Sequence, residues 1–261
     1  MKNLLLKRKL IKINGKTLSY WTNTTKKYQD AYMFLAGGVE KGKFFKKYVE
    51  SLPNKKTKIV IPDYPGRGGS DPIANNNLDF IANQLQKLIK KLKLNKVTLI
   101  GYSFGGALAH EMVKINEKPI SKVIVLASGE FFTDFQKLLI KVLFIPPKYS
   151  ELLRKIYRQA IVKYFPLFDS FPQKNLKSIV EQWLSIINFK LESNKKMDIP
   201  LTLINLRRDN IVKKDSTLKF REIYRNIEVV ELDLPHTWKF DETIKKKMFI
   251  RIINNHTNYF K

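Results

Sequence analysis

The sequence has no cysteine and no uninterrupted apolar run of membrane-spanning length. Without cysteine there are no disulfides, no thiol nucleophile and no cysteine-based metal site. A membrane-spanning helix needs about 18 or more consecutive apolar residues, so none is expected. The three leucines at residues 4–6 are followed at once by Lys and Arg, and this run is too short for the core of a signal peptide. We therefore expect a cytoplasmic protein.

Arginine is also scarce, because only nine of the 49 basic residues are Arg, although the net charge is +26. Proteins that bind nucleic acid rely on the forked guanidinium group to contact bases and phosphates. The lysines are spread through every segment, which is typical of a solvated Lys-rich surface. We expect no specific nucleic-acid partner. Weak association of this basic surface with an anionic membrane is the alternative, although no patch localises it.

Apolar runs alternate with stretches of helical spacing along most of the chain. A hairpin is predicted around Asn14-Gly15, and amphipathic helices are predicted at 42–51 and 78–92. Buried strands are predicted at 31–36 and 59–62, and further strands at 96–100, 121–128, 200–206 and 227–234. Strands that alternate with helices indicate an α/β fold with a mostly parallel twisted sheet flanked by helices.

One region breaks this alternation. Residues 131–196 have no strand pattern, several helical segments and prolines at 146, 147, 166 and 172. We therefore expect a core formed by residues 1–130 and 197–261, with residues 131–196 inserted as a helical cap. A chain of 261 residues is close to the size at which a single core stops growing.

The segment at residues 101–105, Gly-Tyr-Ser-Phe-Gly, fits the pattern G-x-S-x-G between a predicted strand and a predicted helix. A sharp strand-to-helix turn exposes the central side chain, and the flanking glycines, with Gly106, leave the space that this turn needs. The helix N-terminus and the N–H of Phe104 would stabilise negative charge beside Ser103. Ser103 is therefore the candidate nucleophile. The alternative is a serine that only caps the helix.

A serine hydroxyl needs a base, and the chain has three histidines. His110 lies about two turns along the helix that follows Ser103 and is expected to pack or to face solvent. His256 lies in the terminal residues. His236 follows the last predicted strand, where the chain returns to the sheet edge that carries Ser103, so it is the predicted base. The alternative is a loop histidine without a catalytic role.

The imidazole in turn needs a carboxylate that fixes its tautomer. Asp209 lies just beyond the strand at 200–206 and is the predicted acid. Asp215 in the same loop is the nearest alternative, and Glu130 and Asp134, which follow an earlier strand, are further ones. Any of these could instead be an ordinary surface carboxylate.

A competing pattern begins at Gly37. With Gly42 and Lys43 it fits G-x-x-x-x-G-K, the phosphate-binding P-loop. A P-loop has Ser or Thr after its Lys to bind Mg²⁺, whereas this chain has Phe44. We therefore interpret Lys43 as a solvated helix residue. A P-loop nucleotide protein would require Lys43 rather than Ser103.

These features together resemble the α/β-hydrolase family. The order Ser103, Asp209, His236 is similar to the family's order of nucleophile, acid and base. The segments 63–72 and 91–106 resemble its loop before a long helix and its approach to the nucleophile.

The resemblance covers residues 30–130 and 198–245, while the region between them is similar only in being a helical cap. Many members have His-Gly where this sequence has Ala36-Gly37-Gly38, and the latter is closer to the thioesterase branch. The resemblance implies that the backbone N–H of Gly38 or Val39, together with that of Phe104, forms the oxyanion hole. It implies neither a metal nor an organic cofactor.

We expect a serine hydrolase that cleaves a carboxylic ester of a small to medium apolar acyl group through an acyl-enzyme. An acyl thioesterase uses the same machinery and is one alternative. A non-catalytic ligand-binding protein on a hydrolase scaffold is another. Apolar residues of the cap are candidates for the substrate pocket, or simply for cap packing: Phe131, Phe132, Leu139, Val142, Leu143, Phe144, Ile145, Trp183 and Phe189.

Overall fold

The computed structural model describes residues 5–23, 30–38, 45–46, 49, 57–134, 136–137 and 176–236. Within this part of the chain the elements are β1 (Lys7–Ile13), β2 (Lys16–Thr22), β3 (Asp30–Leu35), β4 (Lys58–Pro62), α2 (Leu78–Lys91), β5 (Lys96–Tyr102), α3 (Phe104–Ile115), β6 (Ile120–Leu126), α6 (Leu176–Ile187), β7 (Leu201–Arg208), α7 (Ser216–Ile223) and β8 (Ile227–Pro235).

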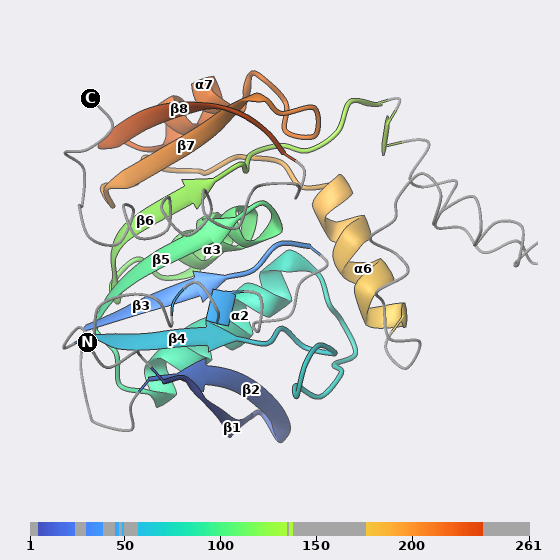
Figure 1. Ribbon diagram of the computed structural model, residues 1–261, viewed down its shortest axis with the longest axis vertical. Helices are drawn as coiled ribbons and strands as arrows, with labels where there is room; N and C mark the ends of the chain where they lie inside the picture. Colours follow the sequence, from blue (N-terminus) through green and yellow to red (C-terminus); the bar gives the residue numbers. More distant parts are fainter. Residues whose placement is uncertain are drawn as a thin grey trace, which may run out of the picture.

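The strands form one eight-stranded sheet in the order β1-β2-β4-β3-β5-β6-β7-β8 (Figure 1). The β1–β2 hairpin is antiparallel, and β2 also pairs antiparallel with β4. All other neighbours, from β4 and β3 through to β8, are parallel. This arrangement confirms the predicted α/β class, the hairpin and the strands, of which β3 and β4 are buried as predicted.

Residues along the central strands alternate between two hydrophobic clusters. Within β3, Ala31, Met33 and Leu35 belong to one cluster, whereas Tyr32 and Phe34 belong to the other. Successive side chains of a strand point to opposite faces, so the sheet is covered on both sides. Burial on both faces explains why these strands are continuous apolar runs rather than alternating ones.

Helices α2 and α3 pack against each other on the first cluster. Asn77 caps α2 by accepting a hydrogen bond from the N–H of Phe80 at 2.9 Å. The predicted helix at 78–92 is thereby confirmed. Of the predicted helix at 42–51, the structure describes residues 45, 46 and 49, and Phe45 and Val49 are buried in the second cluster.

Helix α6 lies at the end of the sheet toward which β3 and β5 point (Figure 1). The side chain of Glu181 accepts a hydrogen bond from Asn76 Nδ2 at 2.8 Å, and Ser185 Oγ accepts one from the N–H of Leu78 at 2.8 Å. Ile186 and Ile187 belong to the first cluster. This end of the region predicted to be a cap is therefore fastened to the core. Residues 138–175 lie outside the described part, so the separate cap stays a prediction.

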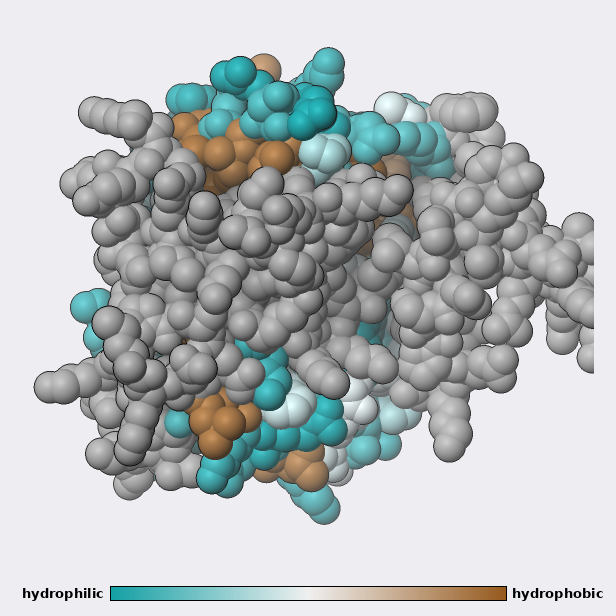
Figure 2. Space-filling model, viewed as in Figure 1, coloured by the Kyte–Doolittle hydropathy of each residue, from teal (hydrophilic) through white to brown (hydrophobic). Residues whose placement is uncertain are grey.

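Figure 2 shows hydrophobic residues gathered over β7 and β8 on one face, next to hydrophilic residues along the rim. Leu232 and Leu234 of β8 are partly buried and pack against the second cluster. Among the helices that the structure describes, none has the length and apolar character needed to cross a membrane.

Candidate active site

Ser103 lies at the turn between β5 and α3, with a φ of 50° and a ψ of −119°. A positive φ is costly for a residue with a Cβ and is found where the surrounding structure imposes it. The side chain of Ser103 makes no capping hydrogen bond to α3. The geometry thus differs from that of a serine that only caps a helix, because the hydroxyl is not used by the helix.

Three glycines let the backbone of this turn come close to its neighbours. A Cβ at Gly101 would collide with the backbone of Gly105, and one at Gly105 would collide with the carbonyl of Leu35 at the end of β3. A Cβ at Gly106 would meet the side chain of Ser128. The absence of side chains at these positions brings the first turn of α3 against the end of β3.

His236 directly follows β8 and is buried. Its Nε2 lies 3.1 Å from Ser103 Oγ, although the two residues are far apart in sequence. The hydroxyl of Tyr102 donates a hydrogen bond of 2.9 Å to the carbonyl of His236 and so ties the end of β8 to the end of β5. The structure therefore brings the predicted nucleophile and the predicted base within hydrogen-bonding distance.

Asp209 follows β7 and lies on the other side of the imidazole. Its Oδ2 is 2.7 Å from His236 Nδ1, and its Oδ1 accepts hydrogen bonds from the N–H groups of Ile211 and Val212 at 2.9 and 3.0 Å. A carboxylate can only accept, so neutral His236 carries its proton on Nδ1. Nε2 is then left with a lone pair directed at Ser103, and the arrangement can take a proton from the serine.

The alternative carboxylates do not contact His236. Asp215 stands at the start of α7, and Asp134 is exposed. Glu130 accepts hydrogen bonds from Lys219 Nζ at 2.7 Å and from the N–H of Leu191 at 3.1 Å, so it is part of a structural ion pair.

His110 is packed inside the core, in agreement with the first of the two expectations for it. Its Nε2 donates to the carbonyl of Glu192 and its Nδ1 accepts from the hydroxyl of Tyr224, both at 3.1 Å. Burial lowers the pKa of His110 to about 4, so it is neutral at ordinary pH. His256 lies outside the described residues.

Gly38 follows β3 and lies beside the first residue of α3. A Cβ at Gly38 would be 3.8 Å from Phe104 Cβ and 3.5 Å from the ring of Trp183 on α6. Within the described part of the chain, neither the N–H of Gly38 nor that of Phe104 donates a hydrogen bond to a protein acceptor. Two adjacent N–H groups without protein acceptors can bind an oxyanion. Val39 and the rest of the P-loop-like pattern, Gly42 to Phe44, lie outside the described residues.

Two residues that support this loop were not identified from the sequence. The hydroxyl of Tyr64 donates to the carbonyl of Ala36 at 2.8 Å. The guanidinium group of Arg67 donates to the carbonyls of Gly37 and Gly38 at 3.2 and 2.5 Å. Both belong to the segment 63–72, whose family resemblance was noted, but no sequence pattern connects that segment with the glycines after β3.

Of the aromatic residues predicted for a substrate pocket, Trp183 lies beside Gly38 of the candidate site. Its ring contacts the position of Gly38, and its centroid is 6.2 Å from that of Phe132. Phe131 and Phe189 are buried in the first hydrophobic cluster, where they pack the core. Leu139, Val142, Leu143, Phe144 and Ile145 lie outside the described residues.

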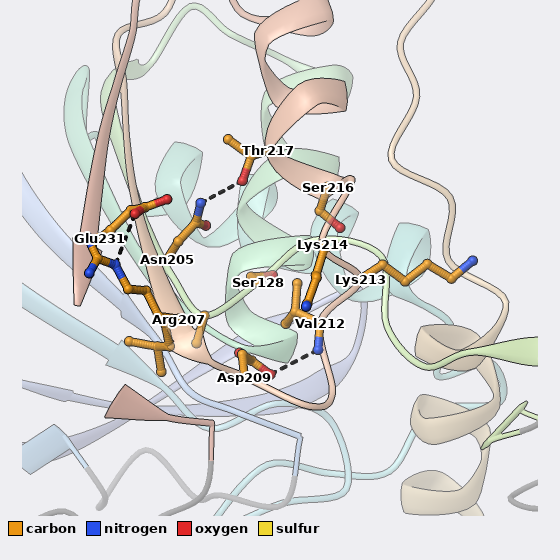
Figure 3. Close-up of a pocket in the computed structure, with 12 residues that line it drawn as sticks. Ser128, Asn205, Arg207, Asp209, Val212, Lys213, Lys214, Ser216, Thr217 and Glu231 are labelled. Carbon is orange, nitrogen blue, oxygen red and sulfur yellow. Dashed lines mark hydrogen bonds and ion pairs between the residues drawn. The ribbon is translucent and has the colours of Figure 1, made fainter. Parts of the chain in front are cut away.

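A cavity of about 270 Å³ lies behind Asp209, between the end of β7 and the start of α7 (Figure 3). Its lining includes Ser128, Asn205 and Lys214. Ser128 Oγ is buried and has no hydrogen-bond partner within the described part of the chain. Neither Ser103 nor His236 lines this cavity. The cavity is therefore distinct from the space in which these two residues meet.

A family model described as "alpha/beta hydrolase fold" matches residues 33–178. Curated relatives match over shorter stretches. The magnesium-chelatase 30 kDa subunit of Rhodobacter capsulatus is 27% identical over 41% of this chain and 38% of its own length. A 2-hydroxy-6-oxononadienedioate/2-hydroxy-6-oxononatrienedioate hydrolase of Dechloromonas aromatica is 32% identical over 33% of this chain and 30% of its own. The chain thus spans about a third of the length of these relatives.

Solved structures match almost the whole chain. The alpha/beta hydrolase enzyme MGS-M2, from a Medee basin deep-sea metagenome library, superposes with a TM-score of 0.74 at 16% identity, covering 96% of this chain and 98% of that one. The esterase EaEST from Exiguobacterium antarcticum superposes with a TM-score of 0.71 at 16% identity, covering 93% and 97%. At such identities the likeness shows a shared fold.

Proposed function

Because this chain belongs to the alpha/beta hydrolase family, whose model matches more than half of it, we propose that it is a serine hydrolase that cleaves a carboxylic ester of a small to medium apolar acyl group. One observation carries the proposal. Ser103 Oγ, the imidazole of His236 and the carboxylate of Asp209 form a continuous series of contacts at 3.1 and 2.7 Å. An isolated serine is a weak nucleophile, and this series is what activates one.

The first half of the reaction follows from these positions. Ser103 Oγ attacks the carbonyl carbon of the ester, and its proton passes to His236 Nε2. Asp209 stabilises the imidazolium that forms. The N–H groups of Gly38 and Phe104 stabilise the negative oxygen of the tetrahedral intermediate. As the intermediate collapses, His236 returns the proton to the leaving alkoxide, and an acyl group remains on Ser103.

In the second half, His236 takes a proton from a water molecule that attacks the acyl-enzyme, and the carboxylic acid leaves as Ser103 regains its proton. The carbon chain of the acyl group is expected to lie near Trp183, which is next to Gly38, and near Phe132, whose ring packs with that of Trp183. Aromatic walls favour apolar groups over charged ones. The esterase among the structural neighbours is consistent with this substrate class.

The glycines after β3 favour a second candidate, an acyl thioesterase. Ala36-Gly37-Gly38 is closer to the thioesterase branch than to members with His-Gly at this place. The two functions differ only in the leaving group, so a matched series of oxygen esters and thioesters with the same acyl chains separates them. A kcat/KM for acyl-CoA far above that for the matching ester would assign the chain to the thioesterases.

A fluorophosphonate probe tests whether Ser103 is an activated nucleophile. We expect the purified protein to be labelled, and Ser103→Ala and His236→Ala to remain unlabelled. Ser128→Ala is the control, because Ser128 is a buried serine whose hydroxyl makes no hydrogen bond within the described part of the chain. This control should be labelled like the wild type. Absence of labelling in wild-type protein with an intact circular dichroism spectrum would overturn the proposal in favour of a ligand-binding protein.

A further inference from the structure

The carbonyls of three consecutive residues after β3 all accept hydrogen bonds from the same loop. Ala36 accepts from Tyr64, and Gly37 and Gly38 accept from the two terminal nitrogens of Arg67. In an extended strand, successive carbonyls point in opposite directions. Here the chain turns after β3 so that all three carbonyls reach the segment 63–72.

This turn determines where the Gly38 N–H points. The carbonyl of Gly37 and the N–H of Gly38 belong to one planar trans peptide and therefore point in opposite directions. Arg67 holds that carbonyl at 3.2 Å, so the N–H of Gly38 is directed away from the guanidinium group. Within the described residues, no protein acceptor takes this N–H.

Arg67 is suited to hold these two carbonyls. The planar guanidinium group has parallel N–H donors in a fixed geometry, so it can bind two successive carbonyls at once, which an ammonium group cannot do with the same rigidity. Arg67 is 5% exposed, and its guanidinium carbon lies 5.4 Å from the ring centroid of Tyr64 and 5.7 Å from that of Phe104. The side chain is therefore held on several sides.

The contact with Phe104 links both halves of the candidate oxyanion hole. Phe104 supplies one N–H and Gly38 supplies the other in the proposed mechanism. Arg67 packs on the ring of Phe104 and donates a hydrogen bond to the Gly37–Gly38 peptide. A charge-assisted hydrogen bond at the carbonyl also polarises the peptide and makes its N–H a stronger donor.

We propose that Arg67 is a positioning residue that turns the Gly38 N–H toward the oxyanion formed at Ser103. This inference rests on the proposed function, because it assumes that a tetrahedral intermediate forms there. Arg67 does not touch the substrate in this scheme. It acts through the Gly37–Gly38 peptide, and its contribution appears when the carbonyl oxygen becomes negative.

The test compares Arg67→Met, Arg67→Lys and a control, Arg8→Met. Removing one oxyanion donor from a hydrolase lowers kcat by about 100-fold to 1,000-fold, so loss of the residue that orients a donor should lower kcat by about 10-fold to 100-fold with little change in KM. Arg67→Lys keeps the charge but loses the fork, and it should remain at least about 10-fold slower than wild type. Arg8 lies on β1 near the same loop, 3.9 Å from Asp63, but bonds neither glycine carbonyl, so Arg8→Met should keep the wild-type kcat.

A second readout separates positioning from general support of the fold. A trifluoromethyl ketone bound to Ser103 carries an oxyanion, whereas the corresponding trifluoromethyl alcohol is neutral and has no carbonyl carbon for Ser103 to attack. The inhibition constant of the ketone should rise by the same factor by which kcat/KM falls, while the constant of the alcohol stays unchanged. Equal weakening of both ligands would show a merely structural role and overturn the proposal.

The outcomes distinguish this inference from the proposed function. If wild-type protein is not labelled by the fluorophosphonate, the proposed function fails, and the inference falls with it. If wild-type protein is labelled but Arg67→Met reacts and turns over at the wild-type rate, only the role of Arg67 is overturned. If Arg67→Met does not fold, Arg67→Lys is the variant that tests the proposal. A wild-type kcat for Arg67→Lys would show that the forked guanidinium group is not needed to orient the Gly38 N–H.

Discussion

The carboxylate of Asp209 divides its two oxygens between His236 and its own loop. Oδ2 lies 2.7 Å from His236 Nδ1, while Oδ1 accepts the N–H groups of Ile211 and Val212. The loop bonds hold the carboxylate in one rotamer. The same side chain thus shapes the loop after β7 and orients the imidazole that faces Ser103.

Asp209→Asn separates these two tasks. The amide oxygen can keep the loop hydrogen bonds, but the amide nitrogen would face Nδ1 and favour the tautomer with its proton on Nε2, which cannot accept from Ser103. We expect kcat to fall by about 10,000-fold, with nearly unchanged stability toward urea. Asp215→Asn is the control in the same loop and should keep its activity. Loss of activity in Asp215→Asn alone would show that the acid has been misassigned.

Gly105→Ala should destabilise the fold. Its Cβ would collide with the carbonyl of Leu35, which is backbone and cannot rotate away. Overpacking of this kind costs about 1–3 kcal/mol or more, measurable as a lower urea midpoint. Gly38→Ala is the matched control, because its Cβ would meet Trp183 at an ordinary 3.5 Å. Its unfolding free energy should stay within about 0.5 kcal/mol of wild type. Equal destabilisation of both variants would contradict the close approach of α3 to β3.

Glu130→Gln should weaken the fold at neutral pH and leave the chemistry intact. Burial alone would raise the pKa of Glu130, but hydrogen bonds from Lys219 and from the N–H of Leu191 outweigh it and hold the pKa below its usual value. The folded protein then binds fewer protons than the unfolded chain near and below pH 4.5, so this stabilisation is present above that pH and is lost as the pH falls. Urea unfolding at pH 7 and pH 4 should show the difference between variant and wild type shrinking at pH 4. A constant difference would argue against an ionic contribution.

The contribution of Glu111 to the unfolding free energy should change with pH in the opposite direction. Burial raises its pKa to about 7, although a hydrogen bond from Lys114 lowers it in part. The folded protein therefore binds more protons than the unfolded chain between pH 4.5 and about 7, and the stabilisation present at low pH is lost as the pH rises through 7. Glu111→Gln cannot titrate, so its unfolding free energy should decline less than that of wild type between pH 5 and 7.5. An unchanged slope would show that Glu111 is ionised throughout. Burial lowers the pKa of His110 to about 4, so its contribution to the unfolding free energy changes with pH in the reverse sense. This contribution is the same in wild type and in Glu111→Gln.

Much of the fold could be predicted from local pattern. A strand buried on both faces is a continuous apolar run, and β3 and β4 contain such runs, so both strands could be located in the sequence. The carboxyl ends of parallel strands meet at one edge of the sheet. Ser103, Asp209 and His236 follow β5, β7 and β8, so their meeting could be expected without knowledge of any contact.

Contacts between loops could not be predicted in this way. Nothing in the spacing of residues 63–72 indicates that Arg67 bonds Gly37 and Gly38, because that contact depends on the turn of the chain after β3. Glu130 was a candidate for the acid because it follows β6, and only the positions of Lys219 and Leu191 explain its structural role. The attachment of α6 to the core likewise depends on single polar side chains such as Glu181 and Ser185.

The place of β8 at the margin of the sheet has a consequence for how activity is lost. In the described sheet β8 pairs with β7 alone, and His236 follows its last residue. Separation of this one strand would carry the imidazole away from Ser103 while the remaining strands stay paired. Local openings of this kind require less free energy than global unfolding. We therefore expect the proposed activity to be lost in mild denaturant through fraying of this single edge strand, before the helical circular dichroism signal of the fold begins to decay.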